Sequence, residues 1–404
     1  MPQVEPEMAH KQSKARNIIL VIGIMFIAIN LRPALASVGP LVGIIREHTG
    51  LSNSLLGLLT TLPLIAFGVV STLTPLFTRR FGIGGTLAGA LILITIGIAL
   101  RALDFIPTLF IGTAMFGTGI AFGNVLLPSL VKRNFPANSG IMTSLYSAVM
   151  AIGASLAAGL SIPLANTLSL GWRGSLGIWA FLSLAAFFVW LPQLWHIKKV
   201  NRQRSYLKAM KSLTRSMVAW KVALFMGLQS MAFYVILAWL PEILQSRGID
   251  SLEAGWMLSL SQATGVFGSL FIPIWAGRIR DQRPIVYTLI TLELLSLIAL
   301  MNPQIGFIAV WVSLIGFALG GSFGLALLLI VHRSEDSDTA TELSGMAQSI
   351  GYLLAALGPI LLGGLFDITG NWNYSLFTLL LIALVKLYMG LGAAKPVKLE
   401  LKIE

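Results

Sequence analysis

The sequence contains no cysteine and few charged residues. None of its 404 residues is cysteine, which excludes disulfides and thiolate metal sites, and the four histidines show no metal-ligand spacing. Charged residues make up 11% of the chain, against about 25% in soluble proteins, whereas 56% of the residues are hydrophobic. No Ser/His/Asp arrangement or phosphate-binding loop indicates catalysis. We expect an integral membrane protein that is not an enzyme and needs no cofactor or metal.

The apolar segments predict helices, because they lack the period-two alternation of barrel strands. The polar stretch 1–16 is short and no cleavage site follows it, so we expect the first apolar segment to be retained as a span. The predicted fold class is all-α, with 12 transmembrane helices in two pseudo-symmetric six-helix bundles. The spans are expected at roughly residues 17–45, 52–78, 83–101, 107–131, 138–168, 172–195, 217–245, 251–277, 284–301, 305–332, 339–366 and 372–393.

The net charge of +12 is distributed unevenly over the connecting segments. With the amino terminus inside, 22 of the 28 lysines and arginines fall in cytoplasmic segments, and two (Arg32 and Lys386) fall within spans. Only four lie in outer loops, namely Arg46, Arg101, Arg173 and Arg247. This positive-inside pattern places both termini in the cytoplasm and explains the basicity without a nucleic-acid partner.

Two halves of the chain repeat each other at an offset near 200 residues. Segment 50–57 aligns with 248–255, where Ser52 and Asp250 are expected helix N-caps. Gly119 and Gly123 align with Gly320 and Gly324, which favours close helix packing over a phosphate-binding role. We therefore predict a tail (1–16), a bundle (17–195), a basic linker (196–216), a second bundle (217–393) and a tail (394–404).

One charge lies deep in the first expected span. Arg32 follows about fifteen residues of helix, which at ~1.5 Å per residue carries it roughly 22 Å into a core ~30 Å thick. A guanidinium there costs several kcal/mol unless it faces water, a partner or a ligand. The acids Asp104, Glu242, Asp250, Glu253 and Asp367 lie near the outer face. We expect Arg32 to bind an anion through its planar fork. The alternative is a structural role, in which it caps carbonyls freed by Pro33.

Neutral polar residues also occur within the expected spans. Together they suggest a polar lining around one positive charge, although each alone could equally be a hydrogen bond between helices worth ~0.6–2 kcal/mol. The predicted substrate-binding residues are Arg32, Asn30, Asn124, Tyr146, Gln229, Tyr234, Gln262, Gln348 and Tyr352.

Two opposite charges lie at similar depths in the ninth and twelfth spans. Glu293 follows Pro284 by nine residues and Lys386 precedes Lys395 by nine, so each is about 13 Å from the cytoplasmic end. We favour a structural ion pair over a proton-coupling role. If transport is coupled to protons, Glu293 and Glu242 are the candidates.

Several motifs resemble the cyanate/nitroimidazole (CynX/NimT) branch of the major facilitator superfamily. They are Asn-Leu-Arg-Pro at 30–33, the run 123–133 from Gly-Asn to Lys-Arg, Phe-Tyr at 233–234 with Trp-Leu-Pro at 239–241, and Gln-Ser at 348–349 with Gly-Tyr at 351–352. One departure is Arg79, which stands where the superfamily's loop between the second and third spans has aspartate. We therefore do not carry over the charge relay of that loop.

The resemblance implies a transporter of the bacterial inner membrane. We expect a monomer that moves a small anionic or weakly acidic solute by alternating access, with Arg32 as the substrate anchor. The alternative is a multidrug or nitro-heterocycle exporter in which Arg32 is structural. A channel is disfavoured by the paired halves and their single long linker.

Overall fold

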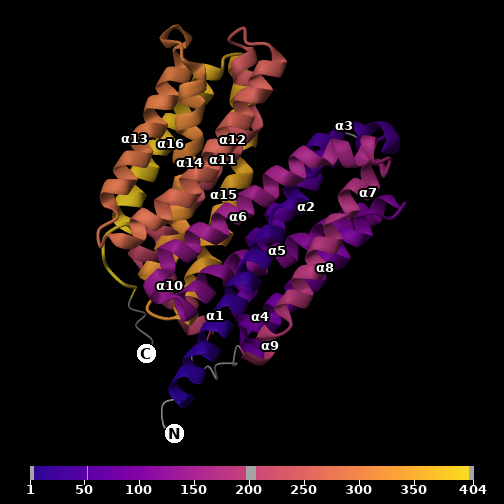
Figure 1. Cartoon of the computed structure of the whole chain (residues 1–404). Helices are drawn as coiled ribbons and strands as arrows, with labels where there is room; N and C mark the ends of the chain where they lie inside the picture. Colours follow the sequence, from indigo (N-terminus) through magenta and orange to yellow (C-terminus); the bar gives the residue numbers. More distant parts are fainter. Residues whose placement is uncertain (1–3, 52, 197–205, 400–404) are drawn as a thin grey trace. The chain divides into compact units, whose positions relative to one another are not determined.

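The computed structural model describes residues 4–51, 53–196 and 206–399, and every regular element within these ranges is a helix (Figure 1). The longer helices are α1 (Val4–Asn30), α3 (Val38–Thr49), α4 (Asn53–Arg101), α5 (Ile106–Asn134), α6 (Ser139–Ile162), α8 (Trp179–Trp190), α10 (Tyr206–Arg215), α11 (Met217–Gln245), α12 (Ser251–Arg278), α13 (Arg283–Met301), α14 (Ile308–Arg333), α15 (Ser337–Thr369) and α16 (Trp372–Ala393). The short ones are α2 (Pro33–Ala36), α7 (Gly171–Gly177), α9 (Gln193–His196), η1 (Pro136–Asn138), η2 (Pro163–Thr167) and η3 (Pro303–Ile305).

Eleven helical segments of the described residues are long and apolar enough to cross a membrane. The second of them, Thr61–Arg101, holds two of the predicted spans, because α4 continues through a joint at Gly82. Gly82 has φ 72° and ψ 171°, a backbone conformation in which a Cβ atom would clash. The prediction of an all-helical membrane protein is confirmed, and the joint accounts for the difference between eleven segments and twelve spans.

The first predicted span, 17–45, matches the apolar segment Asn17–Thr49, but this segment is a broken helix and not a continuous one. α1 ends at Asn30, the short α2 begins at Pro33, and α3 begins at Val38. Proline lacks an N–H, so the hydrogen bond that would continue α1 through Pro33 cannot form.

The chain forms two compact units. Unit 1 comprises Met1–Leu59, Thr78–Gly123 and Val149–Asn201, and unit 2 comprises Thr60–Phe77, Asn124–Ala148 and Arg202–Glu404. Two segments from the first half of the sequence therefore pack with the second half. The predicted bundle boundaries at 195 and 217 remain a prediction.

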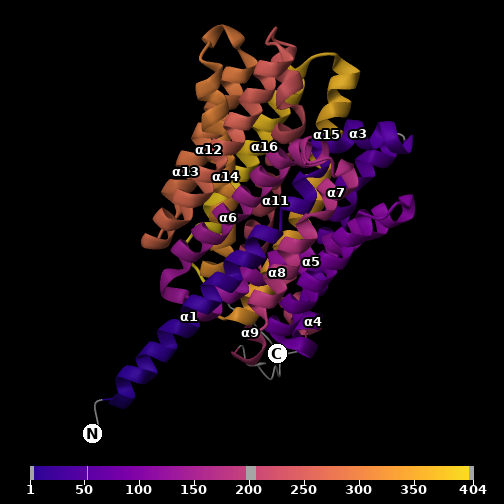
Figure 2. The ribbon, with the colours of Figure 1, turned by 45° about the vertical axis from the view of Figure 1, so that its right-hand side comes forward.

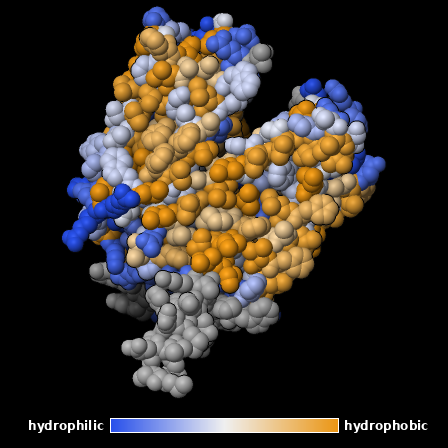
Figure 3. Space-filling view, viewed as in Figure 1, coloured by the Kyte–Doolittle hydropathy of each residue, from blue (hydrophilic) through white to orange (hydrophobic). Residues whose placement is uncertain are grey.

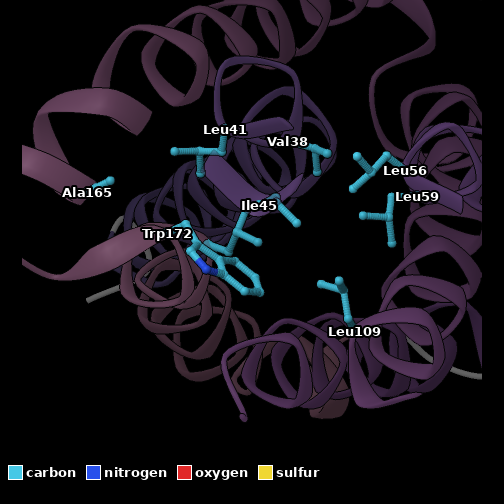
Figure 4. Close-up of a cluster of buried hydrophobic side chains, with 9 residues drawn as sticks. Val38, Leu41, Ile45, Leu56, Leu59, Leu109, Ala165 and Trp172 are labelled. Atoms are coloured by element: carbon cyan, nitrogen blue, oxygen red, sulfur yellow. The ribbon is translucent and has the colours of Figure 1, made fainter. Parts of the chain in front are cut away.

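Unit 1 has an apolar cluster beside the interrupted first span. Val38, Leu41 and Ile45 lie on α3; Val38 points toward Leu56 of α4, Leu41 points to the side where Ala165 lies, and Trp172 lies beneath Ile45 (Figure 4). These side chains are all at most 5% exposed. Their burial fixes α3 against its neighbours despite the break that precedes it.

Unit 2 contains helices α10 to α16. Figures 1 and 2 both show α12, α13, α14 and α16 side by side, and α11 packs on α15. The linker helix α10 packs on α11 and α15, and its Ala209 and Leu213 are fully buried. Asp250 caps α12 as predicted, since its Oδ1 accepts the Glu253 N–H at 3.3 Å. Its predicted counterpart, Ser52, lies outside the described residues.

The surface of unit 2 is apolar along the helices. Figure 3 shows orange atoms over the middle of α12 to α14 and blue atoms gathered at the helix ends. Among the exposed apolar side chains are Leu295 and Ile298 on α13 and Leu381, Leu384 and Val385 on α16. Such a band is the surface that lipid tails cover.

Candidate functional site

Arg32 lies at the break between α1 and α2. It is the residue before α2, with φ −126° and ψ −34°, and its carbonyl accepts the Leu35 and Ala36 N–H groups at 3.1 and 3.0 Å. Its side chain is half-buried. An interrupted helix at membrane depth exposes backbone groups, which is tolerated only where they are buried in protein or line a watery cavity. The break therefore places the positive charge of Arg32 beside the backbone groups that the interrupted helix exposes.

Two glycines hold the residues just before Arg32 against α5 and α6. A Cβ atom on Gly123 would lie 2.5 Å from Leu31 Cδ2, and one on Gly153 would lie 2.7 Å from the Ile29 carbonyl oxygen. Gly119, one turn before Gly123, is as tightly packed, at 2.6 Å from the Ala90 oxygen. The packing interpretation of these repeated glycines is confirmed for this half.

The glycines of the second half have the same role. A Cβ on Gly324 would lie 2.7 Å from Pro273 Cγ, and one on Gly320 would overlap the Gly265 backbone. In both halves, the repeated glycines bring helix backbones together.

The Asn30 side chain is hydrogen-bonded within unit 1. Its side-chain Nδ2 donates to the Phe26 oxygen at 2.7 Å and to the Leu182 oxygen of α8 at 3.4 Å, and the residue is 3% exposed. These bonds tie the end of α1 to α8. In this structure Asn30 supports the break next to Arg32.

Arg101 is a buried arginine whose burial the sequence did not reveal. The charge pattern assigns it to an outer loop, but it is 0% exposed and ends α4 inside unit 1. Its Nη1 donates to the Ala34 carbonyl in α2 at 2.8 Å, and its guanidinium carbon lies 4.8 Å from the centre of the Phe116 ring. Its Nε and Nη2 have no hydrogen-bond partner among the described residues. Arg101 thus holds α2 just beyond Arg32.

Three of the predicted site residues come together in unit 2. Asn124 Nδ2 donates to the Tyr352 hydroxyl at 3.2 Å, and Gln348 Nε2 donates to the Asn124 carbonyl at 3.1 Å. The Tyr352 ring packs on Phe67, with centroids 4.7 Å apart. Asn124, Gln348 and Tyr352 are each at most 4% exposed. We call Asn124, Gln348 and Tyr352 the amide–tyrosine cluster.

The remaining predicted residues of unit 2 are more dispersed. Gln229 is 1% exposed and donates to the Ser230 hydroxyl at 2.8 Å, while Tyr146 is also 1% exposed. Tyr234 and Gln262 are half-buried, and the Tyr234 ring meets Phe233 edge-on.

Glu293 and Lys386 form a buried ion pair between α13 and α16. The Lys386 ammonium donates to Glu293 Oε2, and the side chains of Lys386 and Glu293 are 0% and 2% exposed, respectively. The predicted pair is confirmed. Glu242, the other coupling candidate, is exposed on α11.

Glu342 is a buried carboxylate that the predicted site does not include. It lies in the second turn of α15 and is 1% exposed. Its position, three residues into the predicted span 339–366, resembles that of a residue in the headgroup region. A charge at such a position normally faces water, so the sequence alone did not single out Glu342.

Small polar residues attach segment 124–148 to the second-half helices of unit 2. Thr341 Oγ1 donates to Ser129 Oγ at 2.6 Å, and Ser147 Oγ donates to the Ser269 oxygen at 3.0 Å. A Cβ on Gly140 would be 2.5 Å from the Pro273 oxygen. These contacts join α5 to α15 and α6 to α12 at the end of unit 2 that the charge pattern predicts to be cytoplasmic.

Comparisons with known proteins agree with this architecture. The family model described as the Major Facilitator Superfamily matches residues 18–356. The uncharacterized transporter YycB of Bacillus subtilis (strain 168) is 44% identical over 390 residues, which are 96% of this chain and 96% of YycB. The solved structure of the Escherichia coli fucose:proton symporter FucP has a TM-score of 0.71 at 12% identity, covering 92% of this chain and 98% of FucP, and supports the fold alone.

Two further relatives identify the branch. The 2-nitroimidazole transporter of Escherichia coli (strain K12) is 39% identical over 383 residues, covering 95% of this chain and 97% of that protein. The cyanate transport protein CynX of the same strain is 28% identical over 354 residues, covering 87% and 91%. The helices, the repeated glycines and the near-complete coverage lead to one assignment. The chain is a membrane transporter of the Major Facilitator Superfamily, in the branch that holds the cyanate and 2-nitroimidazole transporters.

Proposed function

We propose that the chain moves a small anionic or weakly acidic solute across the bacterial inner membrane by alternating access, with Arg32 as the anchor for its negative group. The observation that carries the proposal is the half-buried Arg32 at a break in the first span. A charge at that depth is costly, and it favours a solute with a complementary charge. The names of two relatives, cyanate transport protein and 2-nitroimidazole transporter, support small solutes of this kind.

The shape of the guanidinium decides how the anchor is tested. An arginine presents a planar fork that fits two oxygens, whereas lysine presents a single point charge. Arg32→Lys therefore keeps the charge and removes the fork, and Arg32→Gln removes both. Arg280, which lies outside the predicted spans, provides a matched control in Arg280→Gln.

The assay is uptake of radiolabelled cyanate and other small monoanions into proteoliposomes. We expect Arg32→Gln to abolish uptake and Arg280→Gln to transport like wild type. Arg32→Lys should raise KM by about tenfold or more, because losing one charge-assisted hydrogen bond costs about 1.5–3 kcal/mol. Wild-type kinetics in both Arg32 variants would refute the anchor.

A second candidate function is export of planar nitro-heterocycles, with Arg32 serving structure. It is favoured by the aromatic pair of Phe67 and Tyr352, because flat rings suit a planar solute. This function predicts that overexpression confers resistance to nitro-heterocycles, and that the Arg32→Gln variant confers the same resistance.

Coupling to protons would require a carboxyl group that changes protonation during the cycle. We add the buried Glu342 to Glu242 and Glu293 as candidates. Each Glu→Gln variant is tested for loss of proton uptake with retained solute exchange, the pattern expected of a coupling residue.

We also propose that the protein acts as a monomer with both termini in the cytoplasm. The absence of native cysteine allows single-cysteine labelling without background. With an impermeant maleimide on intact spheroplasts, Phe307→Cys, at the outer end expected for α14, should react, and Lys208→Cys on α10 should react only after lysis. The reverse result would invert the topology.

A further inference from the structure

A basic pocket lies at one end of unit 2, where α11 and α13 begin and α16 ends. Its volume is about 530 Å³, and its polar lining includes Lys221, Arg283 and Lys395 together with Asp281, Tyr287 and Tyr388. The positive-inside pattern places this end in the cytoplasm. Figure 3 shows hydrophilic atoms gathered at the lower left, over the end of α13 and beside the apolar helix surface. None of the predicted substrate-site residues lines the pocket.

The pocket carries an excess of positive charge. Three of its side chains are cations and one is a carboxylate, which leaves a net charge of +2. That carboxylate is occupied, because Arg283 Nε lies 2.9 Å from both oxygens of Asp281 and Nη2 lies 2.5 Å from one of them. The hydrogen bonds from Arg283 lower the pKa of Asp281, so the carboxyl stays ionised at neutral pH. A ligand of this pocket should therefore be an anion.

The cations are held in place by their surroundings. The stem of Lys221 lies over Gly392, where an added Cβ would be 2.8 Å from Cε and 3.0 Å from Nζ. The segment that carries Lys395 is tied down by Arg333, whose Nε and Nη2 donate to the carbonyls of Ala393 and Ala394 at 2.7 and 3.0 Å.

Arg333 also ties down the other side of that segment. Its own carbonyl accepts the Leu399 N–H at 2.7 Å, and the residue is 4% exposed. Lys395 is thus flanked by two fixed points, and little ordering is needed when an anion binds.

The walls of the pocket match the level of lipid headgroups. Tyr287 and Tyr388 are 53% and 66% exposed at the ends of α13 and α16, where aromatic belts are expected. Farther along the same helices the exposed side chains become apolar, with Leu295 on α13 and Leu384 on α16. An amphiphile could therefore place its anionic head among the cations and its chains along these helices.

We propose that this pocket binds the phosphodiester headgroup of an anionic phospholipid, of the phosphatidylglycerol or cardiolipin type. Basic pockets between helix ends on the cytoplasmic side suit such headgroups, and each lysine or arginine near an anionic surface contributes about 1 kcal/mol. The site is independent of the substrate site proposed above. It fixes a lipid against α13 and α16, the helices that also share the Glu293–Lys386 pair.

The test compares lipid binding by the wild type and two triple variants in neutral detergent. One variant carries Lys221→Gln, Arg283→Gln and Lys395→Gln in the pocket, and a control carries Lys208→Gln, Lys211→Gln and Arg280→Gln outside it. Native mass spectrometry with phosphatidylglycerol and phosphatidylcholine measures the bound fraction. We expect the pocket variant to bind phosphatidylglycerol more weakly by about fivefold for each of the three cations removed, and the control to retain wild-type binding.

Three results would overturn the proposal. They are equal losses in the two variants, equal binding of phosphatidylcholine, and displacement of the lipid by inorganic phosphate at low millimolar concentration. Gly392→Leu provides a variant that keeps every charge and pushes Lys221 from its place. It should weaken phosphatidylglycerol binding severalfold while substrate uptake in proteoliposomes is retained, and unchanged lipid binding in this variant would also count against the site.

Discussion

Replacing Glu293 with glutamine tests whether the buried ion pair serves structure or proton coupling. The substitution keeps the volume and removes the negative charge, which leaves the Lys386 ammonium in a site where its side chain is 0% exposed. Breaking a buried pair from one side costs about 3–5 kcal/mol, because the remaining charge has lost both water and its partner. That cost corresponds to roughly two to three and a half orders of magnitude in the unfolding equilibrium.

The double variant Glu293→Gln with Lys386→Met completes the test. It removes both charges, so most of the lost stability should return, since a buried pair replaced by uncharged groups of similar volume is often neutral in stability. Unfolding in mild detergent, followed by circular dichroism, gives the free energies. Glu242→Gln is the control, because that carboxylate is exposed and its loss should change stability by about 0.5 kcal/mol or less.

Two outcomes would refute a purely structural pair. In the first, Glu293→Gln is no less stable than the Glu242→Gln control. In the second, the double variant regains wild-type stability and still cannot move protons with its solute, which would assign Glu293 to coupling.

Three further predictions concern helix contacts and buried polar groups. Gly140→Val should slow transport at least tenfold, because the added side chain would separate α6 from α12. Gly159→Val, where nothing lies within 4 Å, should transport like wild type. Equal transport rates in the two variants would contradict a role for the contact between Gly140 and α12. Arg101→Met should raise the substrate KM and Arg101→Lys should restore it in part, measured by uptake, whereas unchanged KM in both would remove Arg101 from the support of α2. Tyr352→Phe should lower the free energy of unfolding by about 0.6–1.7 kcal/mol, the range for hydrogen bonds in membranes. If Asn124→Ala lowers it by the same amount and the double variant loses no more, the two residues act together.

Much of the fold could be predicted because it depends on composition and periodicity. Apolar length sets the helices, and positions repeated in both halves marked the glycines Gly123 and Gly324, which the structure confirms as packing sites. The pair Glu293–Lys386 was also predictable, because two opposite charges at the same depth each need a partner.

Residues near span ends were harder to judge from the sequence. Arg101 and Glu342 both lie within a few residues of a predicted boundary, where a charge normally faces water. Arg101 is buried against Ala34 of α2 and Phe116 of α5, and a single sequence does not show which helices will cover the end of a span. The break after Asn30 was missed for a related reason. Proline in a membrane helix is often tolerated with only a kink, so Pro33 alone did not predict a broken helix.

The joint at Gly82 sets a restriction on insertions and deletions in this chain. The second and third spans meet there without a loop that could absorb a change in length. Adding one residue after Gly82 would turn the following helix by about 100° about its axis and shift it by ~1.5 Å. Nineteen residues later, Arg101 would face away from the Ala34 carbonyl that it now holds. The rotational phase of the third span is thus fixed at its first residue, and natural variation at the joint should consist of substitutions that preserve its length.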